Sequence, residues 1–306
     1  MTTDRRSSIL SRAAPAAVLV VILSCCGRVP QADRLLTDAV DASTTLATYY
    51  DTLMSVTLDG WENQGVYNAL LEIAAPNGEQ YEERLLAFRR RAEVAHTLVL
   101  VYQRLEILRD PKGLGSVTSA GQALGEAIKG IPNLPGGATV PSDQLGTAAA
   151  TIANLQRDHD FKRALGALGT ITTGLRTIFE AEERTYTSVQ ADRADTATSL
   201  LKALAKRKLT NPGSLLPSLH LGLTIDAPTD DAGKAAGLAI AVISAERQKL
   251  AWTCATVQTR LLLNALDTIT TAINKGATVS LLDLENATSH ATACLTEHDA
   301  LAKAKP

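Results

Sequence analysis

The residues with the clearest potential for chemistry lie near the carboxyl end of the chain. His290, Cys294 and His298 are spaced four residues apart, so all three share one face of a helix. Imidazole nitrogen and thiolate sulfur are ligands that zinc and copper prefer. However, positions 290 and 298 are about 12 Å apart along a helix, too far to bind one ion together. A metal site would therefore use one histidine, Cys294 and ligands from another helix, with Glu297 close by.

A disulfide competes for the same cysteine. Cys254 and Cys294 are the only cysteines outside the adjacent pair near the N-terminus, and exported proteins form disulfides. If the helices around Lys275-Gly276 form an antiparallel hairpin, the two cysteines differ in axial height by roughly 8 Å. A bridge needs Cα atoms within about 7 Å, so the turn must be uneven. The residues favour a Cys254–Cys294 disulfide and leave two buried thiols or a metal site as alternatives.

Other polar residues have simpler interpretations. His96 lies near the apolar side of a predicted helix and His159 lies in a charged segment, so both are expected in ordinary hydrogen-bonded or surface positions. The acidic segment 226–231 lacks the alternating ligands and central glycine of a calcium loop, and we expect Asp230 or Asp231 to cap a helix. The chain contains no G-x-S-x-G, H-E-x-x-H or phosphate-loop motif. We therefore predict no catalytic residue and no cofactor.

The N-terminus has the three zones of an export signal. Arg5, Arg6 and Arg12 form a positive segment, and residues 13–23 form an apolar run of eleven. As a helix this run spans about 16 Å, roughly half of a bilayer core. It is therefore typical of a signal peptide over residues 1–24 and too short for a stable anchor.

The end of this signal, Ile22-Leu23-Ser24-Cys25, resembles the lipobox of bacterial lipoproteins. The resemblance covers residues 1–25 only. It implies diacylglycerol on the Cys25 thiol, cleavage before Cys25 and acylation of the new amino group; Cys26 is the alternative modification site. A plain secretory signal is the competing interpretation. With the lipid, residues 25–30 would form a tether on the extracytoplasmic side. If the organism has two membranes, the absence of Asp after Cys25 favours the outer one.

The composition of the remaining chain is that of a folded helical protein. Of the 306 residues 45% are hydrophobic and only 4% aromatic, which favours helices packed through small side chains over a sheet. The net charge is −2 for the whole chain, and about −4 without the signal, so no nucleic-acid partner is indicated. The most apolar remaining segment, residues 235–245, is too short to cross a membrane.

Apolar residues recur at steps of three and four, as in amphipathic helices. A first helix is expected to end at Asp59-Gly60, followed by a second from Asn63 to Ala74 and a turn at Pro76-Asn77-Gly78. Residues 79–109 carry two apolar stripes, which predicts a central helix with neighbours on two sides. We expect its run Arg89-Arg90-Arg91 on a solvated face, paired with glutamates.

In the second half, helices are predicted over residues 116–129 and 144–156, with the Pro/Gly-rich loop 131–141 between them. A long helix begins near Leu165, but its continuation over 180–199 has few apolar residues and is expected to project or fray. After a second loop at 214–229, a helix is expected to reach Asn274. Its apolar stripe is expected to run through ten residues: Ile240, Ile243, Leu250, Cys254, Val257, Leu261, Leu262, Leu266, Ile269 and Ile273. The last helix is expected from Ser280 to about Lys303.

Together these segments predict one all-α domain over residues 31–306, an antiparallel bundle of about six to eight helices. The leading functional hypothesis is a lipid-anchored, non-enzymatic interaction or scaffold protein of the cell envelope with a protein partner. One alternative is an envelope enzyme or metal-binding protein using His290 and Cys294, which metal analysis would reveal. Another is a membrane-acting helical protein, which leakage from lipid vesicles would reveal.

Overall fold

The computed structural model describes residues 30–106, 114–134, 137, 139–155, 161–207, 219, 221 and 230–302. Within these residues the chain forms seven α-helices and no strand. The prediction of an all-α bundle with six to eight helices is therefore confirmed. The signal segment, Cys25, Cys26, His159 and most of the loop 214–229 lie outside the described residues.

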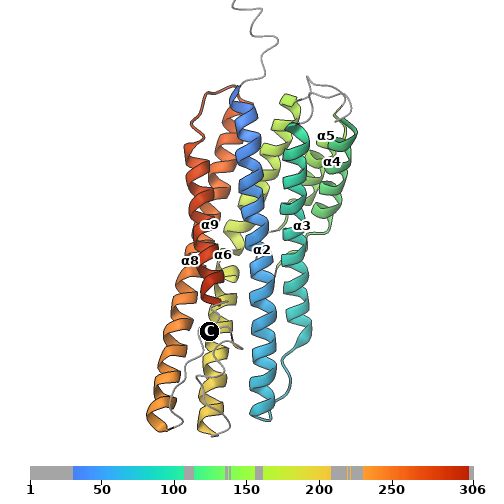
Figure 1. The fold of residues 1–306 in the computed structure, drawn as a ribbon. Coiled ribbons are helices and arrows are strands. Elements are labelled where there is room, and N and C mark those ends of the chain that lie inside the picture. Colours follow the sequence, from blue (N-terminus) through green and yellow to red (C-terminus); the bar gives the residue numbers. More distant parts are fainter. Residues whose placement is uncertain are drawn as a thin grey trace, which may run out of the picture.

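Three of the helices are much longer than the others. In chain order, the helices are α2 (Pro30–Leu70), α3 (Gly78–Glu106), α4 (Leu114–Lys129), α5 (Ser142–Ala153), α6 (Phe161–Lys206), α8 (Asp231–Asn274) and α9 (Leu282–Ala302). The long helices α2, α6 and α8 contain 41, 46 and 44 residues, or about 60–70 Å each at a rise of 1.5 Å per residue. They run along an elongated bundle (Figure 1).

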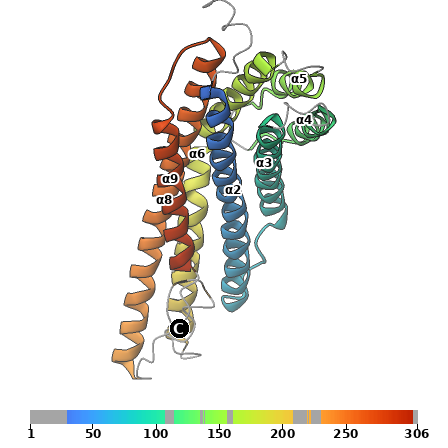
Figure 2. The ribbon, with the colours of Figure 1, turned by 45° about the horizontal axis from the view of Figure 1, so that its top comes forward.

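α2 occupies the middle of the bundle and contacts α3, α6, α8 and α9. α6 packs along α8, and α8 continues through a turn into α9, which returns beside it. α4 and α5 lie against α3 and α6 near the end where α2 begins (Figures 1 and 2). α3 therefore has neighbours on two sides, α2 and α4, as its two stripes predict, but the central helix is α2.

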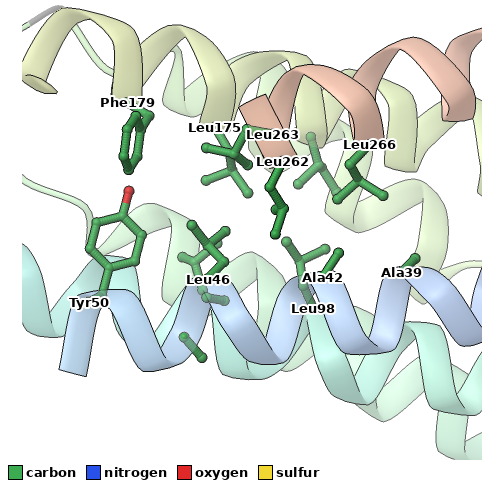
Figure 3. Packing of buried hydrophobic residues seen from close by; sticks show 14 of the residues in the cluster. Ala39, Ala42, Leu46, Tyr50, Leu98, Leu175, Phe179, Leu262, Leu263 and Leu266 are labelled. Carbon is green, nitrogen blue, oxygen red and sulfur yellow. The ribbon is translucent and has the colours of Figure 1, made fainter. Parts of the chain in front are cut away.

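The core between the long helices combines small and large side chains. Ala39 and Ala42 of α2 lie opposite Leu262 and Leu266 of α8 (Figure 3). At mid-length the core becomes aromatic, with six buried rings: Tyr49, Tyr50, Phe88, Phe179, Tyr186 and Trp252. The rings of Tyr49 and Trp252 are stacked, with centroids 4.9 Å apart. Most of the few aromatic residues are thus used where four helices meet.

Several helix ends follow the capping and turn signals of the sequence. Asp230 is the N-cap residue of α8, and its carboxylate accepts a hydrogen bond from the backbone amide of Gly233 at 2.8 Å. The carboxamide oxygen of Asn77 accepts one from the amide of Glu79 at 3.1 Å at the start of α3. Gly276 has φ +79° in the turn before α9, a conformation that favours glycine. The predicted turns at these positions are correct.

The expected break at Asp59-Gly60 is wrong, because α2 continues through it. A Cβ atom at Gly60 would lie 3.4 Å from the Cβ of Arg193 on α6, so this position of α2 packs directly against α6. The Asp59 carboxylate lies 3.5 Å from Nε of the same arginine. The pair thus forms a contact between helices, and glycine inside a helix costs only about 1 kcal/mol.

The expectation that residues 180–199 project or fray is also wrong. They form the middle of α6, and Glu182, Gln190 and Arg193 among them are at most 1% exposed. With the buried Tyr186 they follow Phe179 at steps of three or four, so they continue its buried face with mostly polar side chains. Burial of this segment depends on hydrogen bonding as well as on apolar contact.

The apolar stripe predicted for α8 is buried over its last four residues, Leu262, Leu266, Ile269 and Ile273, but partly exposed before them. Ile243 is 58% exposed and Leu250 is 70% exposed. The side of α8 that packs into the bundle instead carries buried residues such as Ala245 and Trp252. The prediction is therefore correct for the second half of α8, and Ile240 and Cys254 also pack against the core. It is wrong for Ile243, Leu250 and Leu261, which face solvent.

Candidate functional site

A cleft of about 280 Å³ lies between α2, α3 and α6, towards the end of the bundle where α2 ends. Its walls combine polar and apolar side chains from these three helices. They are Val56, Thr57, Gly60 and Gln64 of α2, Tyr81 and Arg84 of α3, and Val189, Asp192, Arg193, Asp195 and Thr196 of α6. The first turns of α3 thus complete a cleft whose inner wall is the contact between α2 and α6 at Gly60.

Arg193 is the most deeply buried charged residue of this cleft, at 1% exposure. Its Nη1 donates a hydrogen bond to Oε1 of Gln248 at 2.7 Å, and Asp59 lies opposite its Nε. Burial lowers the pKa of Arg193, and Asp59 opposes this effect. An arginine side chain retains its proton in proteins, so the inner wall carries a positive charge that Asp59 partly balances.

The outer part of the cleft carries both signs of charge. Burial raises the pKa of Asp192, the positive charge of Arg84 lowers it, and Asp195 raises it further. Asp195 also accepts a hydrogen bond from Nζ of Lys249 at 2.6 Å. A ligand at the cleft would therefore meet a guanidinium donor and carboxylate acceptors within a short distance.

Aromatic and amide side chains border these charges. Tyr81, in the cleft wall, stacks on Trp61 with ring centroids 6.2 Å apart. The Thr196 hydroxyl donates to Oε1 of Gln64 at 3.2 Å, and Nε2 of Gln64 donates to Asn68 at 2.6 Å. Ring faces beside fixed hydrogen-bonding groups suit the reversible binding of a polar chain or side chain.

A second polar group lies deeper, and we call it the Arg91 cluster: Arg91, Glu182 and Tyr186. Arg91 of α3 donates from Nε and Nη2 to the two carboxylate oxygens of Glu182, at 2.8 and 2.5 Å. The Tyr186 hydroxyl donates to the same carboxylate. The solvated face expected for the arginine run is therefore wrong for Arg91, whereas Arg89 and Arg90 do pair with Glu93.

A third group, the Arg193 cluster, joins Asp59, Gln190, Arg193, Gln248 and His298. His298 Nε2 lies 3.2 Å from Oε1 of Gln190, whose Nε2 lies 3.4 Å from Oε1 of Gln248. The ring of His298 also packs on Trp252, with centroids 5.1 Å apart. Burial lowers the pKa of His298 to about 4, and the charge of Arg193 acts in the same direction.

Cys254 and Cys294 form a disulfide between α8 and α9, with Cα atoms 5.8 Å apart. The predicted axial mismatch is absorbed by an uneven connection, residues 275–281, between the two helices. The two cysteines therefore lie as close as a disulfide requires. The bond also uses the Cys294 thiol that a metal site would need.

The three residues of the metal hypothesis are not brought together. His290 is exposed, whereas His298 is 2% exposed and bound within the Arg193 cluster. In the part of the chain that the structure describes, no group of three His, Cys, Asp or Glu side chains could hold a metal ion. His96 is exposed and its Nε2 lies 3.0 Å from Asp51.

The lipidation residues Cys25 and Cys26 fall outside the described residues. None of the described helices has the length and hydropathy needed to cross a membrane. Comparisons of the chain with protein-family models, with curated proteins and with solved structures gave no match. We therefore infer function from the residues and their geometry.

Sequence reasoning named Arg91 and His298 in other roles and missed their buried partners, although a signal was present. Arg91 lies between Phe88 and Ala95 at steps of three and four, and Gln248 lies likewise between Ala245 and Trp252. A polar residue in register with a buried stripe marks a buried hydrogen bond. Its partner, on a distant helix, could not be named from one helix alone.

Proposed function

We propose that this chain is a lipid-anchored, extracytoplasmic helical interaction protein without catalytic activity, tethered through Cys25. The observation that carries the proposal is the Cys254–Cys294 disulfide, because such bonds persist in exported proteins and are rare in reducing compartments. It is an indication of export that is independent of the lipobox-like segment. Two indications at opposite ends of the chain thus agree on the same compartment.

The geometry of α2 supports a role in presenting a binding surface away from the membrane. Cys25 precedes the first residue of α2, Pro30, by five residues, which span at most about 18 Å. Gly60 in the cleft lies thirty residues further along α2, about 45 Å at 1.5 Å per residue. A lipid at Cys25 would hold the start of α2 near the bilayer and leave the cleft accessible to a partner from the envelope.

Anchoring is tested by cell fractionation and mass spectrometry in the native host. We expect the mature protein to start at Cys25, to carry acyl chains there and to remain with the membranes. Cys25→Ala should release the protein from the membranes or leave it uncleaved, whereas the adjacent Cys26→Ala should behave as the wild type. An unlipidated Cys25 in mature membrane protein would overturn the proposal.

Partner binding is tested by a photo-crosslinking amino acid introduced at Gln64 in the cleft, with Thr147 on the distant helix α5 as the control position. We expect one discrete adduct from position 64 in intact cells, and its loss when Asp192→Lys reverses the charge at the cleft. Equal adducts from both positions, or an adduct that is insensitive to Asp192→Lys, would exclude the cleft as the recognition site.

A further inference from the structure

The solvent-facing stripe of α8 from Ala232 to Leu261, here called the α8 outer face, carries the most exposed apolar side chains of the bundle. Leu250 is 70% exposed and Ile243 is 58% exposed, the highest values among the large hydrophobic residues that the structure describes. Leu261 follows on the same side at 43%. Apolar side chains aligned along one helix face indicate a surface that another molecule covers.

The α9 helix covers one edge of this face at Cys254, through the disulfide to Cys294, and leaves Ile243 and Leu250 exposed. Nε2 of Gln248 donates to the backbone oxygen of Leu301 at 3.2 Å, so α9 ends beside the middle of α8. The first half of α8 extends beyond that end (Figure 1). Glu246 and Arg247, at the centre of the α8 outer face, are exposed.

The positions of the residues on the α8 outer face are symmetric about the midpoint between Glu246 and Arg247. Ile243 precedes Glu246 by three residues, and Leu250 follows Arg247 by three. Further out, Ala236 precedes Glu246 by ten residues and Val257 follows Arg247 by ten. A stripe that is symmetric about its own midpoint can pair with an identical stripe that runs in the opposite direction.

We propose that the α8 outer face binds the same face of a second copy of this chain, in an antiparallel pair with its two-fold axis between Glu246 and Arg247. Such an interface is isologous, so each contact occurs twice. It places the Glu246 carboxylate of each copy opposite Arg247 of the other. Ile243 of each copy then packs on Leu250 of the other.

The outer contacts are complementary in size. In this register the small Ala236 faces the larger Val257 of the second copy, and Ala232 faces Leu261, which is equally distant from the midpoint. Small side chains opposite large ones let two helices pack without voids. A parallel, in-register pair would instead set Glu246 against Glu246 and Arg247 against Arg247, so charge selects the antiparallel arrangement.

The pairing does not depend on the lipid anchor of the proposed function. Because the two α8 helices run in opposite directions, the two α2 N-termini lie at opposite ends of the pair. Chains anchored to two facing membrane surfaces would meet in this orientation, whereas neighbours in one membrane would not. Failure of lipidation at Cys25 would therefore leave the dimer in place.

The test is sedimentation velocity of the purified full-length protein in a non-ionic detergent. We expect a concentration-dependent dimer. Glu246→Arg and Arg247→Glu should each raise its Kd at least about tenfold, because each sets like charges opposite one another. An equimolar mixture of the two variants should regain wild-type affinity, since the mixed pair again has opposite charges at both contacts.

A matched control is Glu126→Arg on α4, because Glu126 is exposed and pairs with Lys129 as Glu246 pairs with Lys249. It should leave the Kd unchanged, and circular dichroism should show the same helix content for every variant. A wild type that stays monomeric at about 100 µM overturns the proposal, and so does a mixture that remains as weak as its components. If the monomer instead binds anionic vesicles through Ile243 and Leu250, the occupant is a lipid surface and the proposal is wrong.

Discussion

Arg91 on α3 donates two hydrogen bonds to the carboxylate of Glu182 on α6, and neither side chain is more than 1% exposed. A buried ion pair is stable only when further hydrogen bonds satisfy both groups. Here the Tyr186 hydroxyl donates to the carboxylate, and Arg91 also donates to the backbone oxygens of Ala87 and Pro132. The ion pair therefore fixes three segments: α3, α6 and the start of the loop after α4.

Removing one partner of this pair should be strongly destabilising. Glu182→Gln leaves the guanidinium buried without its counter-charge, and we expect the free energy of unfolding to fall by about 3–5 kcal/mol. Urea denaturation followed by circular dichroism measures the change. Glu180→Gln, two residues away on the exposed side, is the matched control and should change the value by less than about 0.5 kcal/mol.

The double variant Arg91→Met/Glu182→Met distinguishes a charge effect from a packing effect. Two apolar side chains leave no buried charge, so this variant should be more stable than Glu182→Gln. If it is less stable than the single variant, the pair contributes mainly by its shape.

The buried His298 should make stability depend on pH. Burial and the charge of Arg193 lower its pKa from 6.5 to about 4, so between these values the unfolded chain binds the proton and the folded chain does not. The contribution of His298 to the free energy of unfolding should therefore be complete above about pH 6.5. This free energy should then fall by about 3 kcal/mol as the pH decreases to about 4. Denaturation curves across this range measure the loss.

The contribution of this histidine is isolated by two variants on the same helix. His298→Gln should lose this part of the pH dependence, because glutamine does not titrate. His290→Gln, at an exposed position two turns away, should retain it. Identical pH profiles for the wild type and His298→Gln would assign the acid sensitivity to other groups.

Reduction of the Cys254–Cys294 bond should destabilise the bundle without changing its fold. The cysteines are 40 residues apart, and a closed loop of this length corresponds to about 4 kcal/mol of stabilisation through the unfolded chain. We expect dithiothreitol to lower the free energy of unfolding by about this amount or less. The variant Cys254→Ala/Cys294→Ala should have the lower stability already and not respond to dithiothreitol; a wild type that is equally insensitive would contradict the bond.

Much of the fold could be predicted because it depends on local interactions, in which both partners lie within one short segment of the chain. Asp230 caps α8 with its own side chain, and Gly276 supplies the conformation that its turn requires. These positions could be predicted because both partners lie within a few residues of each other. The helices themselves follow from apolar spacing in the same way.

The errors arise where a residue's partner is distant in sequence. The spacing of Ile243 and Leu250 shows that they share a face, but one helix cannot indicate whether that face lies inward or outward. The sequence predicts a helix end at Gly60, because it does not show that Arg193 of another helix packs against this glycine. The cleft could not be predicted for the same reason, because its walls come from three helices and no single segment contains all of its residues.

Two helical glycines should respond in opposite ways to the same substitution. A Cβ atom at Gly121 on α4 would lie 2.5 Å from the backbone nitrogen of Ala153 on α5, so Gly121→Ala must separate the two helices and should cost about 1–3 kcal/mol. At Gly146 on α5 no atom lies within 4 Å of the added Cβ, and the helix gains up to about 1 kcal/mol from Gly146→Ala. Because alanine favours a helix at both positions, helix propensity alone predicts that both substitutions stabilise the protein. Only the close contact between α4 and α5 predicts that Gly121→Ala destabilises it while Gly146→Ala stabilises it. Thermal denaturation of the two variants decides, and a stabilised Gly121→Ala would show that α4 and α5 do not approach as closely as described.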